Sequence, residues 1–599
     1  MNRMLAGLTH ADYAVLLGYF VIMLGIGVYF WRYMKGMRDY FSGRNLIPWW
    51  LSGVSYYMTS FSAFLFVSYS ENAHRYGFVA LTQGWMVIPA VLVGAIVFSK
   101  LWRRARIDSP VEYIEERYGL GLRQTFGWAN IPVRMIDNGL RLYATGLFVS
   151  VTLDAPLEDS IIWSGLITLA YTFAGGLWAV AVTDFVQFVI MMAGSILLVP
   201  LALARTGGPL ELLRNAPADT WTVTAGPYTS LYLLAWFLLL LCNYNTSFGL
   251  VQRYYCVRDE KEARKTGLLV AGLVLIGTPV FILPALAARQ FLPDAPSKDI
   301  YGVLCRELLP SGALGLIVAA MFSATMSSLS GDYNAAAAVL TNDVYRRLLD
   351  PGASQRRLVF VGRLTTVLLG LIPLSIALYV ARTIGGDVLF RKMVTVFSVA
   401  APPIAVPMLA GLIWRRASNA GAIAAFLSGI GTGLTLYFLV DNGVVDPARV
   451  LMAVGLSNES KAPEILLTLS TFLTSLAVLV AVSLLVPARG PEQERRERFL
   501  ARLRTPVPPL ERADREGVPS PWGAVGVSVM ATAVLLLGIQ PAMGWGAGAK
   551  TNLAIGAGLL VIGGLMWHFG RPSERPRGGI SGAVVSAAST GRGNPDSEE

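Results

Sequence analysis

Residues 321–335, Met-Phe-Ser-Ala-Thr-Met-Ser-Ser-Leu-Ser-Gly-Asp-Tyr-Asn-Ala, belong to an apolar stretch that is long enough to cross a membrane as one helix. The stretch nevertheless carries five Ser and Thr hydroxyls, a carboxylate and a carboxamide. Such groups at bilayer depth are costly and usually face a cavity, an ion or another polar group. Adjacent Ser327 and Ser328 supply two hard oxygen ligands for a small dehydrated cation, although hydrogen bonding between small residues of neighbouring helices explains them equally well.

The composition of the whole chain is that of a helical integral membrane protein. Of its 599 residues, 54% are hydrophobic and only 15% are charged. The first apolar segment has no small-residue cleavage site, so we expect an anchor in the lipid bilayer rather than a signal peptide. Fifteen candidate spans lie at about residues 13–33, 47–72, 77–99, 124–152, 159–177, 181–204, 229–251, 266–288, 312–341, 359–381, 393–414, 419–440, 464–486, 522–542 and 552–569.

The net charge of +11 reflects topology rather than nucleic-acid binding. Of the 49 Lys and Arg residues, 33 lie in one alternating set of connecting segments, 13 lie in the other set and 3 lie within spans. This asymmetry follows the positive-inside rule. It predicts a multi-pass protein of the cell membrane with its N-terminus outside and, because the span number is odd, its C-terminus in the cytoplasm.

The sequence offers no catalytic constellation, and we expect no enzyme activity. Cys242, Cys256 and Cys305 have neither metal-ligand nor redox spacing, and the three histidines are far apart. A phosphate-binding G-x-x-x-x-G-K-[ST] loop is missing from the sequence, which argues against an ATP-driven pump. The oligomeric state stays open.

A short sequence match between two spans suggests that the chain contains two related halves. Tyr57-Met-Thr-Ser-Phe61 in the second span and Tyr244-Asn-Thr-Ser-Phe248 in the seventh lie five spans apart. Transporters built from inverted repeats bind their ligands where such corresponding helices are interrupted near the midplane. A match of this length also arises by chance, and neither segment contains a Gly or Pro that would force a break.

Several motifs, in the expected order, resemble the solute:sodium symporter family, which includes sodium–glucose, proline and iodide cotransporters. Residues 175–187, Gly-Gly-Leu-Trp-Ala-Val-Ala-Val-Thr-Asp-Phe-Val-Gln, match the family signature G-G-L-x-A-V-x-x-T-D-x-x-Q. Gln252-Arg253, the segment from Ser327 to Tyr345, and Gly411–Ala422 are similar to three later family motifs. Together these matches extend over about residues 40–440.

The resemblance implies an all-α integral membrane fold with an inverted-repeat core of five plus five helices and about 14–15 spans. Family members commonly have thirteen or fourteen helices, so a fifteenth would be a departure. Residues 487–521 are expected to form a charged connector or a short cytoplasmic helix. The expected organisation is a leading helix and loop at 1–46, repeats at 47–204 and 229–414, peripheral helices at 415–569 with the basic loop 487–521, and a disordered tail at 570–599.

The family's sodium site is carried over residue by residue. Ser327 and Ser328 match its hydroxyl ligands, and Ala324 matches a backbone-carbonyl ligand. Met58 and Phe61 fall where the first core helix supplies two further carbonyls. A helix that loses internal hydrogen bonds frees such carbonyls for an ion.

A second sodium or coupling position is implied at Asp184 and Ser330. Asp184 matches a carboxylate near the ion, although a cap at a helix start explains it as well. Ser330 matches a ligand of members that use two sodium ions. Those members often have another hydroxyl next, where this chain has Gly331, so the sodium:solute ratio stays open.

The solute side is less specific. Arg134, Asp137 and Arg141 share one helical face, where they either receive a carboxylate or hydroxyl-rich solute or hold the helices together. Asn243 and Tyr244 fall where sodium–sugar members place residues below the substrate, but polar residues of those members are not evident at 397–403. Candidate solute contacts are therefore Ser60, Asp137, Arg141, Asn243 and Tyr244.

These features favour a sodium-coupled symporter that imports a small polar organic solute, a sugar, monocarboxylate or amino acid, by alternating access. Sodium is the expected coupling ion. Two alternatives are a proton-coupled amino-acid carrier of the same architecture and a membrane sensor with a transporter-like core. Uptake that survives replacement of sodium by choline would favour the proton-coupled carrier.

Overall fold

The computed structural model describes residues 9–31, 43–61, 63–174, 177–309, 313–383, 389–453, 461–508, 521–543 and 549–570. Within these ranges the chain is helical, with one isolated β-bridge between Ala225 and Tyr228. The expectation of an all-α protein is therefore confirmed. The predicted tail at 570–599 lies almost entirely outside the described residues.

All fifteen predicted spans coincide with a helix or with a run of consecutive helical segments. The elements up to the middle of the chain are α1 (His10–Trp31), η1 (Gly43–Asn45), α3 (Trp49–Ser60), α4 (Ala63–Tyr76), α5 (Val79–Trp85), α6 (Val87–Val93), η2 (Gly94–Phe98), α7 (Ser99–Arg104), α8 (Pro110–Arg117), α9 (Leu120–Leu153), α10 (Leu157–Ala174), α11 (Leu177–Arg205), α12 (Pro209–Asn215) and η3 (Ala218–Trp221). The later elements are α13 (Ser230–Thr246), α14 (Phe248–Tyr255), α15 (Glu260–Phe291), η4 (Ser297–Asp299), α16 (Ile300–Leu308), α17 (Ala313–Val339), η5 (Leu340–Leu349), α18 (Gln355–Thr383), α19 (Leu389–Ile413), α20 (Asn419–Asp441), α21 (Pro447–Ala453), α22 (Ala462–Leu485), α23 (Pro491–Arg504), α25 (Pro521–Met543) and α26 (Ala549–Gly570).

Length and apolar composition identify nine of the described helices as able to cross a membrane, or ten if α13 and α14 form one bent span. The five other predicted spans correspond to α3 with α4, α9, α10, α25 and α26. The first of these is broken in its middle, and α9 carries charged residues in its middle. Both departures from a plain apolar helix lie beside the functional site.

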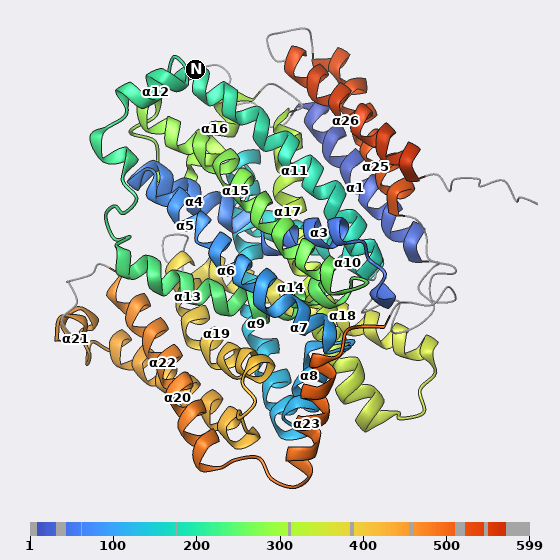
Figure 1. Cartoon of the computed structure of the whole chain (residues 1–599). Helices are drawn as coiled ribbons and strands as arrows, with labels where there is room; N and C mark the ends of the chain where they lie inside the picture. Colours follow the sequence, from blue (N-terminus) through green and yellow to red (C-terminus); the bar gives the residue numbers. More distant parts are fainter. Residues whose placement is uncertain are drawn as a thin grey trace, which may run out of the picture.

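The two halves of the core have opposite orientations. The short helix α8 follows α5–α7 in the first half, and α16 occupies the corresponding place after α15 in the second half. Figure 1 shows α8 at the bottom of the molecule beside α23, and α16 at the top beside α12. We call these the α8 end and the α16 end. The exact boundaries of the two repeats stay a prediction.

The helix α17 is the centre of the bundle. It packs against α11, α9, α18 and α3, and nearly all of its residues are buried. Additional helices form two groups on different sides of the core (Figure 1), where α25 and α26 pack beside α1, and α20 and α22 pack beside α19.

Residues 491–504 form a helix that is docked on the core, which decides between the two expectations for the charged segment. The ring centroids of Phe499 in α23 and Tyr113 in α8 are 5.5 Å apart. Arg104 of α7 donates to the Leu503 carbonyl over 3.3 Å. The connector interpretation is therefore wrong for α23, while residues 509–520 lie outside the described ranges.

A buried arginine closes the α8 end of α19. Arg117 donates to the carbonyl oxygens of Gly411, Trp414 and Ala417 at 2.9, 3.2 and 3.0 Å. A guanidinium at a helix C-terminus donates to carbonyls that have no partner within the helix. Its positive charge also interacts favourably with the negative end of the helix dipole. The side chain thus fixes α19 against α8.

Replacing Arg117 with methionine should lower the apparent Tm of the purified protein by several degrees, because three buried carbonyls lose a charged donor, a loss on the order of 3 kcal/mol or more. A thermal scan in detergent measures the shift. Arg214→Met is the matched control, since the Arg214 side chain is 72% exposed and pairs only with Glu211. Equal Tm shifts for both variants would contradict the role of Arg117 in fixing α19 against α8.

Candidate functional site

The helix that begins the core is interrupted after Ser60. Phe61 has φ of −96° and ψ of 151°, an extended conformation, and α4 resumes at Ala63. Without Gly or Pro, the end of α3 is shaped by its hydroxyls: Thr59 donates to the Ser55 carbonyl and Ser60 to the Tyr57 carbonyl, each over 2.7 Å. The Phe61 carbonyl is thereby released from the helix.

This released carbonyl meets the Ser-Ser pair of α17. The Ser328 hydroxyl donates to the Phe61 carbonyl and, over 3.1 Å, to the Ala324 carbonyl. The Ser327 hydroxyl is buried and lies beside the Asp184 carboxylate of α11, although no hydrogen bond of ordinary geometry joins it to the described residues. The Met58 carbonyl, in the last turn of α3, accepts from the Phe61 N–H over 3.0 Å.

All five residues predicted for the sodium site are thus at the contact between the α3 break and α17. The atoms that could bind an ion here are carbonyl and hydroxyl oxygens. Such ligands suit a hard cation such as sodium and not a metal that prefers sulfur or imidazole. Ser327 adds a further hydroxyl oxygen beside the Asp184 carboxylate, so the set has capacity for an additional ligand.

Asp184 lies within α11, seven residues beyond its first described residue, so the interpretation as a helix cap is wrong. Its carboxylate accepts from Ser55 and lies 3.6 Å from the guanidinium of buried Arg253, measured from Oδ2 to Nη2. The other carboxylate oxygen has no partner among the described residues. The hydroxyl of Ser330 donates to the Ser327 carbonyl of its own helix over 3.1 Å.

The second half has a matching interruption. The axes of α13 and α14 differ by 55°, and Ser247 lies between the two helices. This bend frees the Tyr244 carbonyl, which accepts a 2.6 Å hydrogen bond from the Tyr56 hydroxyl of α3. The two interrupted helices therefore contact each other at the freed backbone.

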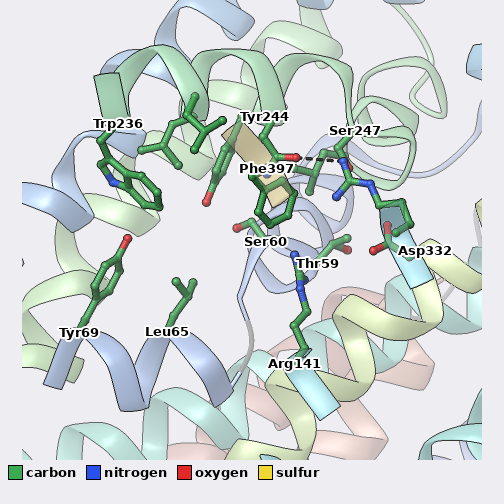
Figure 2. Close-up of a pocket in the computed structure, with 15 residues that line it drawn as sticks. Thr59, Ser60, Leu65, Tyr69, Arg141, Trp236, Tyr244, Ser247, Asp332 and Phe397 are labelled. Carbon is green, nitrogen blue, oxygen red and sulfur yellow. Dashed lines mark hydrogen bonds between the residues drawn. The ribbon is translucent and has the colours of Figure 1, made fainter. Parts of the chain in front are cut away.

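Both interruptions border one cavity of about 750 Å³. Figure 2 shows Thr59, Ser60, Arg141 and Asp332 on one side of it and Leu65, Tyr69 and Trp236 on the other. Four of the five predicted solute contacts line it, namely Ser60, Arg141, Asn243 and Tyr244. The full lining is Thr59, Ser60, Leu65, Tyr69, Arg134, Arg141, Trp236, Leu239, Leu240, Asn243, Tyr244, Ser247, Leu250, Asp332 and Phe397.

The fifth predicted contact, Asp137, lies behind the cavity wall. Its carboxylate is 2.9 Å from the guanidinium of Arg141 and 3.8 Å from that of Arg134. The sequence left open whether these residues receive the solute or hold the helices together. The two roles are compatible, because the arginines that pair with Asp137 also line the cavity. Asp332 of α17 lines the same cavity as both arginines.

A smaller cavity of about 300 Å³ lies beyond Arg134 toward the α8 end. Its lining includes Asn130 of α9 and Ile404 of α19, which are nearer to that end in their helices, and it shares Arg134, Asn243 and Phe397 with the larger cavity. Arg134 donates to the Asn243 side-chain oxygen over 2.9 Å, and its guanidinium carbon is 5.8 Å from the Phe397 ring centroid. These three residues form the partition between the two cavities.

The sequence did not reveal the apolar wall of the larger cavity. Leu65, Tyr69, Trp236, Leu239 and Leu240 belong to otherwise apolar spans, where a residue that faces a cavity has the same chemistry as one that faces lipid. Only the folded arrangement distinguishes the two. Arg134 and Asp332 carried a signal, since charges inside a span are functional candidates by default.

Comparisons with known proteins agree with this geometry. A model of the sodium:solute symporter family matches residues 40–429. The sodium/mannose cotransporter of Bos taurus is 28% identical over 80% of this chain and 87% of its own length, and the sodium/glucose cotransporter of Vibrio parahaemolyticus is 27% identical over 73% and 87%. The sodium/myo-inositol cotransporter 2 of Sus scrofa is 29% identical over 71% and 69%.

A solved structure of a sodium-coupled sialic acid symporter, in a substrate-bound outward-open state, aligns with a TM-score of 0.69 and 23% identity, covering 80% of this chain and 99% of that one. This likeness confirms the expected fold, an inverted-repeat membrane core with additional helices at both ends. The family consists of transporters, so this protein is a transporter and not an enzyme. Since the family model covers well over half of the sequence, the chain belongs to the sodium:solute symporter family.

Proposed function

We propose that this protein imports a small polar organic solute together with sodium across the cell membrane by alternating access. The single observation that carries the proposal is the interruption between α3 and α4. On one side of it the Phe61 carbonyl meets Ser328, and on the other side Thr59 and Ser60 line the cavity. One turn of backbone therefore serves both an ion and a solute.

Sodium enters as a second substrate. The ion is held by the hydroxyls of Ser327 and Ser328 and by the carbonyls of Ala324, Met58 and Phe61. It takes the place of the Ser328 hydroxyl proton as the partner of the Phe61 carbonyl, and it thereby fixes the end of α3. Thr59 and Ser60 are then ordered before the solute arrives, which lowers the entropy that solute binding must oppose.

Asp184 and Ser330 are kept as the candidates for a second ion. Asp184 has one carboxylate oxygen without a partner among the described residues.

The α8 end is the cytoplasmic end in this proposal, because α8 belongs to the connecting segment 100–123, one of the set of segments that holds 33 of the 49 Lys and Arg residues. The N-terminus is then outside, and the C-terminus is cytoplasmic. The partition formed by Arg134, Asn243 and Phe397 closes the cavity toward the cytoplasm. Release requires Arg134 to leave Asn243 when the inner side opens.

The sodium gradient is a sufficient energy source. One charge that moves down 100 mV releases about 2.3 kcal/mol. A tenfold concentration gradient adds about 1.4 kcal/mol. A single coupled ion therefore supports accumulation of a neutral solute by roughly 500-fold, since each 1.4 kcal/mol is a factor of ten.

The solute contacts proposed are Ser60, Arg141, Asn243 and Tyr244, with Asp137 holding Arg141 in place. The relatives named above carry mannose, glucose and myo-inositol, and those solutes are candidates here together with monocarboxylates and amino acids. The shape and charge of the cavity discriminate among these classes.

The double variant Ser327→Ala with Ser328→Ala should raise the half-saturating sodium concentration for uptake at least tenfold, because two of the oxygen ligands are lost. Initial uptake rates in proteoliposomes, measured over a range of sodium concentrations balanced with choline, test this. Ser323→Ala is the matched control, since the Ser323 hydroxyl donates to the Ala319 carbonyl of its own helix over 2.8 Å and is not among the proposed ion ligands. Unchanged sodium dependence in the double variant would refute the site, and full uptake in choline would favour proton coupling.

Arg134→Met should open the partition between the two cavities. We expect efflux of preloaded solute from proteoliposomes, without a sodium gradient, to increase several-fold while the half-saturating sodium concentration changes little. Thr246→Val serves as the control, because Thr246 lines the smaller cavity but its hydroxyl bonds its own helix at the Cys242 carbonyl. Efflux equal to that of the wild type would show that Arg134 is no barrier.

A further inference from the structure

The cavity is divided into a charged half and an apolar half. Arg141 from α9 and Asp332 from α17 lie on one side (Figure 2), and Arg134, which shares the Asp137 carboxylate with Arg141, also lines the cavity. The opposite side carries Leu65 and Tyr69 from α4 and Trp236 from α13 (Figure 2), and Leu239 and Leu240, one turn beyond Trp236 in α13, also line the cavity. Figure 2 shows this separation directly, with Arg141 and Asp332 far from Tyr69 and Trp236.

The polar atoms of the two aromatic residues in the apolar half do not change its character. The Trp236 indole N–H donates to the Gln83 carbonyl over 3.3 Å and is therefore already satisfied. The Tyr69 hydroxyl points toward Trp236 (Figure 2). These side chains consequently offer the solute their rings. A polyol that left its hydroxyls against such a wall would lose hydrogen bonds to water without replacement.

The apolar half continues into an annex, a narrow second cavity lined mainly by aromatic and aliphatic side chains. It shares Leu65, Tyr69 and Tyr244 with the main cavity, and Thr278 is the one other residue of its lining that carries a polar side chain. Its further lining residues are Phe61, Phe66, Gly84, Val87, Val274, Phe281 and Ile282. The Phe281 ring centroid lies 4.5 Å from that of Phe66 and 5.2 Å from that of Phe61, so the annex is walled by aromatic rings.

The charged half presents both signs. Arg141 is already paired with Asp137 at 2.9 Å, but a guanidinium has five N–H donors and keeps some for a ligand. Asp332 lines the same cavity as Arg134 and Arg141. With Asp137 included, two arginines and two carboxylates balance, so this half carries no fixed net charge to bind a simple anion.

We propose that the solute is a zwitterionic α-amino acid with a branched or aromatic apolar side chain. Its carboxylate binds Arg141, its ammonium group binds Asp332, and its side chain extends along Trp236 and Leu239 into the annex. This inference rests on the proposed function and names the solute class of the same cavity. It makes Asp332 and the annex residues specificity determinants, and it separates this chain from relatives named for sugars and inositol.

The test is competition against sodium-driven uptake of radiolabelled leucine by the full-length protein in proteoliposomes. The competitors are leucine, 4-methylpentanoate, which lacks the amine, 3-methylbutylamine, which lacks the carboxylate, alanine, and myo-inositol. We expect leucine to inhibit at least tenfold more strongly than either single-charge analogue. Alanine should be weaker by on the order of 10- to 50-fold, because it buries about three fewer methyl or methylene groups.

Two variants assign the halves of the cavity. Asp332→Asn should weaken inhibition by leucine more than inhibition by 4-methylpentanoate, so that the ratio of their inhibitory strengths falls at least fivefold. Val274→Phe fills the annex and should reduce leucine uptake at least tenfold while alanine uptake is retained. Leu275→Phe is the matched control for the second variant, since it places the same residue on the same helix at a position that is 53% exposed.

The outcomes separate this inference from the proposed function. Sodium-stimulated uptake of myo-inositol or 4-methylpentanoate in place of leucine, or no leucine uptake either with or without sodium, overturns the amino-acid assignment and leaves sodium symport intact. Leucine uptake that does not respond to sodium overturns the proposed coupling and leaves the cavity assignment intact. Unchanged discrimination in Asp332→Asn, with normal leucine uptake, overturns the role of Asp332.

Discussion

The hydrogen bond between Ser328 and the Phe61 carbonyl is the contact on which the rest of the site depends. Backbone at bilayer depth must be satisfied internally, so a membrane helix is interrupted only where other groups replace its lost hydrogen bonds. Here α17 supplies a hydroxyl to the first interrupted helix, and Tyr56 supplies another to the second at Tyr244. These hydrogen bonds satisfy the Phe61 and Tyr244 carbonyls and thereby stabilise the two interruptions that border the cavity.

Because the two interruptions border one cavity, ion and solute share structural elements. Phe61 contributes its carbonyl to the Ser328 contact and its ring to the annex, while Ser60 next to it lines the main cavity. A change at either ligand position therefore acts on the same few residues. Coupling between two ligands requires such an element whose conformation both of them bias.

The sequence predicted the helices well because most spans are long and apolar, and all fifteen segments correspond to helical elements. The resemblance to the symporter family placed Ser327 and Ser328 beside the first core helix, and the contact of Ser328 with the Phe61 carbonyl agrees with that placement. The sequence did not decide whether residues 491–504 dock, because the contact of Phe499 with Tyr113 joins segments far apart in the chain. The sequence also could not predict that Trp236 and Leu239 belong to the apolar cavity wall, since only packing shows that these side chains face a cavity and not lipid.

The most direct measurement of the central claim is binding of radioactive sodium to the purified protein, with and without saturating solute. Linkage requires that solute raises the sodium affinity by the same factor as sodium raises the solute affinity. The shared interruption at Phe61 predicts saturable sodium binding that tightens at least fivefold with solute, and both effects disappear in Ser328→Ala. Sodium affinity that is the same with and without bound solute would contradict a common element at the α3 break.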